Sequence, residues 1–264
     1  MKHIIAVASG KGGVGKSTVA CNLALAIAGM GHRVGLLDAD IYGPSLGAMM
    51  GVPEGTRPEV TSDMLQPIMA HDIQCMSMSF IASDRTPAVW RGPMASGALQ
   101  QMLTQTYWQL VDFMIVDMPP GTGDIQLTLA QRVPLAGAVI VTTPQDIALL
   151  DARKGVEMFS KVAVPVLGIV ENMSTHICSE CGHEESIFGT GGGASIAAEY
   201  GTELLGQLPL SMSVRSQADS GAPTVISNPE GEVAAMFNDI AGKVVAAVDT
   251  GENNRGPKIT IVDD

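Results

Sequence analysis

The sequence has no run of 18 consecutive apolar residues and no apolar leader, since its first five residues pass directly into a short apolar stretch. We therefore expect neither a transmembrane span nor a signal peptide, and we expect a cytoplasmic protein. Basic residues are scarce: the chain has 15 Lys and Arg and 27 Asp and Glu, which gives a formal net charge of −12. Nucleic acids and anionic membranes are bound through Lys and Arg patches, so neither is an expected partner.

Cysteine is also scarce, and only one Cys-x-x-Cys pair occurs, at Cys178 and Cys181. Two thiols at this spacing can bind one metal from a tight turn, but a monomer then lacks two ligands of a four-thiolate site. A symmetric dimer would supply the missing pair. The residues leave four options open: a bridging [4Fe–4S] cluster, a bridging Zn²⁺, a redox dithiol, or a local zinc site that adds His176 and His183. The other two cysteines, Cys21 and Cys75, are predicted to be small buried residues.

The feature around which the chain is organised is the segment from Gly10 to Ser17, which reads Gly-Lys-Gly-Gly-Val-Gly-Lys-Ser. It lies between an apolar run at 4–8 and a predicted helix at 18–28, which is the setting of a phosphate loop. Glycines allow the backbone N–H groups to surround phosphates, and the helix N-terminus adds a positive dipole. We expect Lys16 to contact the β- and γ-phosphates and Ser17 to bind Mg²⁺. The predicted nucleotide-binding residues of this segment are Gly10, Lys11, Gly12, Gly13, Val14, Gly15, Lys16, Ser17 and Thr18.

Carboxylates follow two further apolar runs. Asp38 and Asp40 come after the predicted strand 33–37, and Asp117 ends the predicted strand 113–116. Ligands in open α/β sheets bind at the carboxyl ends of strands, so these groups are candidates for chemistry. Asp40 is predicted to orient the attacking water or to reach Mg²⁺ through water, and Asp117 to hold Mg²⁺. Asp38 is interpreted as a structural acid that holds its loop.

The segment 119–124 reads Pro-Pro-Gly-Thr-Gly-Asp, and its glycines and prolines indicate a loop that rearranges at the γ-phosphate. Its last residue, Asp124, is predicted to cap the next helix. Further along, Asn172 follows the predicted strand 164–170, and a side-chain amide at this point suits an adenine edge, although a plain loop residue is an equal alternative. We also predict short strands at 67–69 and 73–78, and helices at 95–110, 147–162, 194–200 and 232–248.

Taken together, the phosphate loop, the motifs at 38–45, 117–124 and 171–174, and the cysteine pair occur in an order that resembles the Mrp/ApbC family of iron–sulfur cluster carriers. The second lysine of the loop, Lys11, resembles the "deviant" Walker A motif of MinD- and ParA-like ATPases. The resemblance covers residues 1–248. It implies an α/β fold, with a single P-loop NTPase domain whose mostly parallel sheet is flanked by helices on both faces. We expect this domain to span 1–249, followed by a tail at 250–264.

The resemblance implies a slow, switch-like ATPase that uses ATP and Mg²⁺, with Lys11, Lys16 and Asp40 as catalytic residues. Lys11 would cross a homodimer interface to the partner subunit's nucleotide, and Pro209 would lie along the adenine. The dimer would hold a [4Fe–4S] cluster on Cys178 and Cys181 of both subunits and pass it to apo-proteins. A MinD- or ParA-like positioning ATPase, an electron-donating reductase and the same ATPase with zinc on the thiols are the alternatives.

Overall fold

The computed structural model describes residues 1–41, 43–81, 92–178 and 180–250. Its main sheet has eight strands in the order β12-β9-β8-β1-β7-β2-β6-β5, all parallel to their neighbours except β5, which is antiparallel to β6. These strands are β1 (His3–Ala8), β2 (Val34–Asp38), β5 (Ile68–Ala70), β6 (Ile73–Ser77), β7 (Phe113–Asp117), β8 (Gly137–Thr142), β9 (Val166–Glu171) and β12 (Leu204–Gln207).

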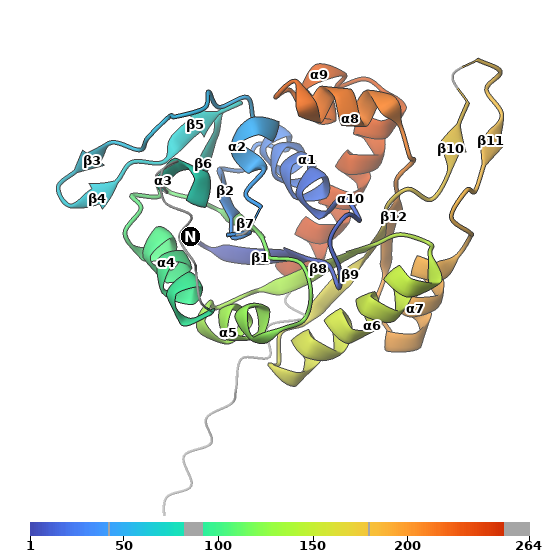
Figure 1. Cartoon of the computed structure of the whole chain (residues 1–264), viewed down its shortest axis with the longest axis horizontal. Coiled ribbons are helices and arrows are strands. Elements are labelled where there is room, and N and C mark those ends of the chain that lie inside the picture. The colour runs from blue at the N-terminus through green and yellow to red at the C-terminus, as the bar shows by residue number, and fades with distance from the viewer. Residues whose placement is uncertain (42, 82–91, 179, 251–264) are drawn as a thin grey trace, which may run out of the picture.

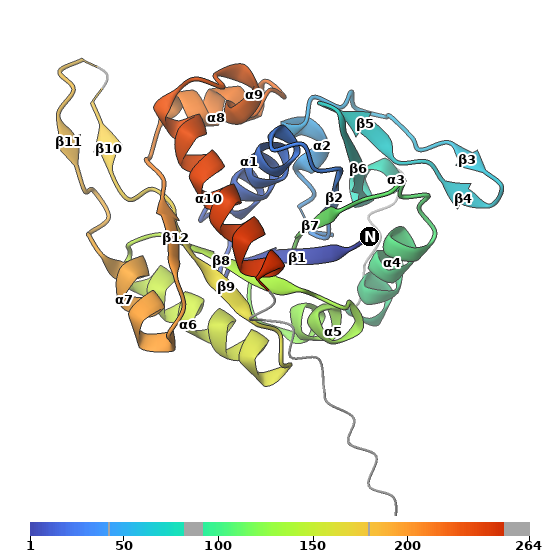
Figure 2. The same ribbon diagram turned by 180° about the vertical axis from the view of Figure 1, so that it is seen from behind.

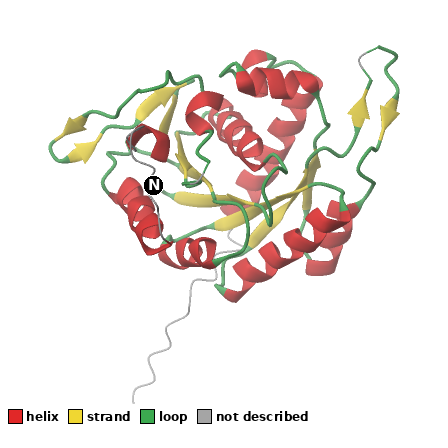
Figure 3. Ribbon diagram, in the orientation of Figure 1, coloured by secondary structure: helices red, strands yellow, loops and turns green. Residues whose placement is uncertain are grey.

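Helices cover both faces of the sheet (Figures 1 and 3). The helices are α1 (Lys16–Gly29), α2 (Leu46–Met49), α3 (Met78–Ile81), α4 (Gly92–Thr104), α5 (Asp124–Arg132), α6 (Asp146–Lys161), α7 (Gly192–Tyr200), α8 (Met212–Asp219), α9 (Thr224–Ser227) and α10 (Glu232–Asp249). Helices α1 and α10 lie side by side on one face, as Figure 2 shows from behind, and α4 to α7 lie on the other. This architecture confirms the predicted α/β fold.

The strands are apolar on both faces because each face is covered. In β1, Ile5 and Val7 belong to the core beneath α1 and α10, whereas Ile4, Ala6 and Ala8 belong to the core beneath α4 to α7. Residues of a strand alternate between faces, so a strand buried on both sides must be continuously apolar. This rule explains why the central strands were found at their predicted positions.

Two local features differ from the expectations. Helix α4 ends at Thr104 rather than at residue 110, because the backbone of Leu65 pairs with Gln105 and Tyr107 (N–O distances of 2.8 Å). Asp124 lies in the first turn of α5, whereas Gly123 occupies the capping position, so the predicted cap is wrong. The predicted tail lies, apart from its first residue, outside the described residues.

Two small hairpins project from the body. One is formed by β3 (Val60–Thr61) and β4 (Met64–Leu65), and the other by β10 (His176–Ile177) and β11 (Glu184–Glu185). They extend from opposite sides of the molecule in Figure 1. In the part of the chain that the structure describes, no helix combines the length and apolar character needed to cross a membrane.

Candidate functional site

The phosphate loop connects β1 to α1, and its shape depends on glycine. Gly13 and Gly15 adopt left-handed backbone conformations, with φ of 82° and 83°. A Cβ at Gly15 would lie 2.2 Å from Nδ2 of Asn172, so both the conformation and the space require glycine there. Helix α1 starts at the next residue, and its first backbone N–H groups therefore point toward the loop. This is the arrangement that binds phosphate at a helix N-terminus.

A buried ion pair joins the loop to the neighbouring strand. Nζ of Lys16 lies 2.5 Å from Oδ1 of Asp117, and the two side chains are only 6% and 1% exposed. Lys16 also donates to Oγ of Ser17 at 3.3 Å. The other carboxylate oxygen of Asp117, Oδ2, is buried without a hydrogen-bond partner among the described residues. Burial raises the pKa of Asp117, an effect that the Lys16 charge opposes.

The unpartnered Oδ2 of Asp117 indicates whether the site suits Mg²⁺. A buried carboxylate oxygen that lacks a donor is costly unless a cation or a cation-bound water satisfies it. Ser17 and Asp117 are oxygen ligands of the kind that Mg²⁺ prefers, beside the loop that is shaped for phosphate. The residues present therefore fit the cation that the sequence predicted.

Asp38 anchors the segment that carries Asp40. It is completely buried, and its carboxylate accepts hydrogen bonds from the backbone N–H groups of Asp40 (3.0 Å) and Leu46 (3.2 Å) and from Oγ of Ser77 (3.1 Å). Burial, together with the nearby charge of Asp117, raises the pKa of Asp38 to about 7. These contacts agree with the interpretation of Asp38 as a structural acid. They fix where the backbone of Asp40 enters the site.

Two of the three catalytic candidates, Lys16 and Asp40, line one cavity of about 230 Å³. Its lining includes Lys16, Ser17, Asp40 and Pro120, together with Ser9, Gly12, Gly13, Gly15, Thr18 and Met49. The 119–124 segment is tied to the first strand's end because the Gly121 N–H donates to the Ser9 carbonyl at 2.9 Å. The structure thus brings Asp40 and six of the predicted phosphate-loop residues to one cavity. Lys11 is not among the lining residues, and it makes no ion pair with any described residue.

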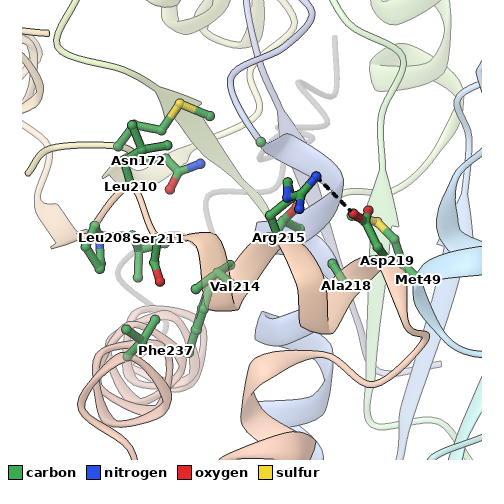
Figure 4. A pocket seen from close by; sticks show the side chains of 15 residues that line it. Met49, Asn172, Leu208, Leu210, Ser211, Val214, Arg215, Ala218, Asp219 and Phe237 are labelled. Atoms are coloured by element: carbon green, nitrogen blue, oxygen red, sulfur yellow. Dashed lines mark ion pairs between the residues drawn. The ribbon is translucent and has the colours of Figure 1, made fainter. Parts of the chain in front are cut away.

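A second cavity, of about 280 Å³, adjoins the first, since both are lined by Gly15, Thr18 and Met49. Its walls are mostly apolar and include Leu208, Pro209, Leu210, Val214 and Phe237 (Figure 4). Polar groups stand at its rim, where Arg215 and Asp219 of α8 form an ion pair of 3.7 Å. An apolar slot beside a phosphate loop has the shape and chemistry of a nucleobase pocket.

Asn172 lies in this second cavity, but its amide also braces the phosphate loop. Its Nδ2 donates to the backbone carbonyl of Val14 at 2.9 Å, and its backbone N–H donates to Thr142 at 2.7 Å. The sequence predicted that the Asn172 amide faces a base, but it did not predict the hydrogen bond from this amide to the phosphate loop.

The two thiols of the Cys-x-x-Cys pair lie between β10 and β11, at the far end of a projecting hairpin. Cys181 is exposed and Cys178 half-buried, whereas Cys21 and Cys75 are 1% and 0% exposed, as predicted. The backbone N–H groups of Cys181 and Glu180, with the Cys181 side chain, lower the pKa of the Cys178 thiol. A lowered pKa favours the thiolate, which is the form that binds metals.

The local zinc site with His176 and His183 is not assembled. Among the described residues, no three His, Cys, Asp or Glu side chains come together as a metal site. Instead, Nδ1 of His176 lies 3.2 Å from the carbonyl oxygen of Leu210. Because Cys21 and Cys75 are buried elsewhere in the fold, this hairpin offers two thiols of its own.

Sequence reasoning missed Glu171 as a structural centre. It is 0% exposed, and its carboxylate accepts from the Gly193 N–H at 2.5 Å and from Nε2 of Gln207 at 2.7 Å. The sequence places residues 215–221 near the site, but it did not predict that α8 is a helix forming one wall of the base pocket. The available signal for Glu171 was a lone carboxylate at the end of a buried strand, whereas the polar sequence of α8 gave no signal of a helix.

Comparisons with known proteins show the family of this chain. The profile of a family described as NUBPL iron-transfer P-loop NTPases, of the ParA type, matches residues 1–245. An iron–sulfur cluster carrier protein of Pseudomonas fragi is 63% identical over 242 residues, which are 91% of this chain and 84% of that protein.

Two solved structures are also similar. The nucleotide-binding protein of Archaeoglobus fulgidus in complex with ADP is 34% identical, with a TM-score of 0.77 over 89% of this chain and 91% of that one. The cell division ATPase MinD of Pyrococcus furiosus has a TM-score of 0.70 over 93% and 99%, at 22% identity, a likeness of fold alone.

Proposed function

The chain belongs to the NUBPL iron-transfer P-loop NTPases, and from this membership we propose that it is an ATP-dependent carrier of [4Fe–4S] clusters. Its cluster is cargo, held between the subunits of a homodimer and passed to client apo-proteins in the cytoplasm. The observation that carries the proposal is that one pair of thiols is presented outside the body while the other two cysteines are buried. Accessible, paired thiols suit a cluster that must be handed on.

The nucleotide part of the proposal assigns each site residue a role. Lys16 contacts the β- and γ-phosphates, Asp40 orients the attacking water, and Lys11 reaches the partner subunit's nucleotide. When bound, Mg²⁺ neutralises phosphate charge and is held by Ser17, with Asp40 and Asp117 acting through water. The backbone from Gly10 to Thr18 surrounds the phosphates. Hydrolysis is slow, as suits a switch.

The base pocket supports ATP over GTP. Nδ2 of Asn172 donates one hydrogen to the Val14 carbonyl, and its Oδ1 forms no hydrogen bond with any described residue, so Oδ1 is available to accept one from a base. An acceptor matches the amino group of adenine and opposes the carbonyl oxygen of guanine. Pro209 supplies an apolar surface for the ring in the same pocket.

Anaerobic reconstitution with iron and sulfide tests the cargo. We expect a brown protein with about four iron atoms per dimer, and a colourless one after Cys178→Ser with Cys181→Ser. Cys75→Ala is the matched control, because it removes a buried thiol and leaves the pair intact. A colourless wild type that retains zinc would instead support the zinc alternative. Binding to DNA or liposomes would support a positioning ATPase.

A further inference from the structure

A backbone ladder connects the sheet to the thiols. Strands β9 and β12 pair up to Glu171 and Gln207, and the pairing continues beyond both strands. The Leu208 N–H donates to the Glu171 carbonyl, and the Ser174 N–H donates to the Leu208 carbonyl, both at 2.9 Å. Oγ of Ser174, which is 6% exposed, donates to the same carbonyl at 3.1 Å.

The ladder then reaches the hairpin. The Leu210 N–H donates to the Thr175 carbonyl at 2.7 Å, and His176 forms an isolated bridge with Leu210. His176 is the first residue of β10, and Cys178 follows that strand directly. We call residues 171–177 and 207–210, in this paired arrangement, the connecting ladder.

Five residues of the connecting ladder line the base pocket, and Ser174 is not one of them. Asn172 and Met173 come from one side of the ladder, and Leu208, Pro209 and Leu210 from the other. A base bound in this pocket would therefore contact both sides of the ladder. The phosphate loop is linked to it as well, through Asn172 and Val14.

One residue of the ladder has an uncommon backbone. Met173 adopts a left-handed conformation, with φ of 58°, between two residues that are fixed by hydrogen bonds. Residues other than glycine rarely adopt this conformation, and it persists only where surrounding contacts enforce it. Here those contacts are the bond from Asn172 to the phosphate loop and the bonds from Ser174 to Leu208.

We propose that the connecting ladder couples the base pocket to the thiols, so that the nucleobase itself, and not only the γ-phosphate, controls the hairpin that carries Cys178 and Cys181. The inference rests on the proposed nucleotide site. A base that packs between the two sides of the ladder restrains both, and the restraint passes through Ser174 and His176 into β10. Coupling of this kind between two sites is a difference in free energy and is therefore reciprocal.

The test measures how fast iodoacetamide alkylates the metal-free protein, by intact-mass spectrometry. Cys178 and Cys181 react first, since Cys21 and Cys75 are buried. Three probes are compared at saturation, established by calorimetry: Mg-ATP, adenosine and Mg-tripolyphosphate. We expect adenosine alone to slow alkylation about fivefold, close to the effect of ATP, and tripolyphosphate to leave the rate unchanged.

Variants of Ser174 separate coupling from a merely structural role. We expect Ser174→Ala to bind adenosine as the wild type does but to reduce its effect on alkylation to about twofold or less. Ser174→Thr, which keeps the hydroxyl, should restore the effect. Ser186→Ala is the control, because this hydroxyl lies beside the same hairpin and forms no hydrogen bond with any described residue.

Each outcome decides the proposal. If adenosine binds and the alkylation rate does not change, the coupling is refuted while the nucleotide site stands. If tripolyphosphate alone reproduces the effect of ATP, the signal passes through the phosphate side and the ladder is not its route. If ATP binds and adenosine does not, the base-pocket assignment fails, and the inference fails with it.

Discussion

Replacing Lys16 with alanine should both abolish ATP binding and destabilise the fold, for one electrostatic reason. The ammonium group lies 2.5 Å from Oδ1 of Asp117, and both side chains are almost fully buried. Its removal leaves a buried carboxylate with no cationic partner, since Oδ2 already lacks a partner among the described residues. Breaking a buried pair in this way costs about 3–5 kcal/mol of unfolding free energy.

The stability lost in Lys16→Ala should depend on pH. Burial already raises the pKa of Asp117 from its ordinary value of 3.8, and the Lys16 charge and hydrogen bond counteract this rise. Without Lys16, the pKa in the folded state rises further above that in the unfolded state. The folded protein then gains stability below the unfolded pKa and loses it as the pH rises. The penalty of Lys16→Ala should therefore be larger at pH 8 than at pH 5.

Urea denaturation in the absence of nucleotide, at both pH values, measures this penalty, and calorimetry measures ATP binding. Adding Asp117→Asn to Lys16→Ala should recover most of the stability but no ATP binding, because the buried charge is gone and the phosphate ligand is still missing. Lys154→Ala is the control: its pair with Asp151 is 2.9 Å long but lies at the surface, and we expect a loss below about 1 kcal/mol. Equal losses for the two lysines, or normal ATP binding by Lys16→Ala, would refute the reasoning.

Three further predictions follow from single contacts. Gly15→Ala should destabilise the protein and abolish ATP binding, because the φ of Gly15 is 83° and the new Cβ would lie 2.2 Å from Nδ2 of Asn172. Gly12→Ala is the control: its new Cβ would meet no atom within 4 Å, so we expect a normal melting temperature. Asp38→Ala should keep its ATP affinity and lose steady-state hydrolysis, because the backbone N–H groups of Asp40 and Leu46 lose their acceptor. Calorimetry measures the affinity, and phosphate release measures the hydrolysis. Asp112→Asn should lower the stability of the protein at neutral pH, and the variant should lose less stability than the wild type as the pH falls. Thermal melts from pH 2 to 7 measure both. The Arg33 and Lys2 partners hold the pKa of Asp112 well below its usual range, so the stability it provides is present above about pH 4 and is lost as the pH falls.

The central strands and the phosphate loop could be predicted from the sequence, because apolar periodicity specifies the strands and a strict motif specifies the loop. Central strands such as β1 and β7 were evident because continuous apolar runs are required where both faces are covered. The phosphate loop was evident because few residue types allow its backbone. The position of Asp117 at the carboxyl end of its strand followed from the same logic.

What the sequence did not predict depends on long-range pairing. The hairpins β3–β4 and β10–β11 have only two residues per strand, too short for an alternating pattern to be visible. Helix α4 stops early because Leu65, some forty positions earlier, takes over the hydrogen bonds of the backbone near Gln105. The contact of Asn172 with Val14 joins residues that only the folded sheet brings together.

The central claim is that Cys178 and Cys181 of two protomers jointly hold an iron–sulfur cluster. Native mass spectrometry of the anaerobically reconstituted protein tests it most directly, because it reports the number of chains and the bound mass together. The account predicts a dimer with one added [4Fe–4S] mass, absent from the double serine variant. A monomer that carries the metal alone, or a dimer whose added mass is zinc, would contradict it.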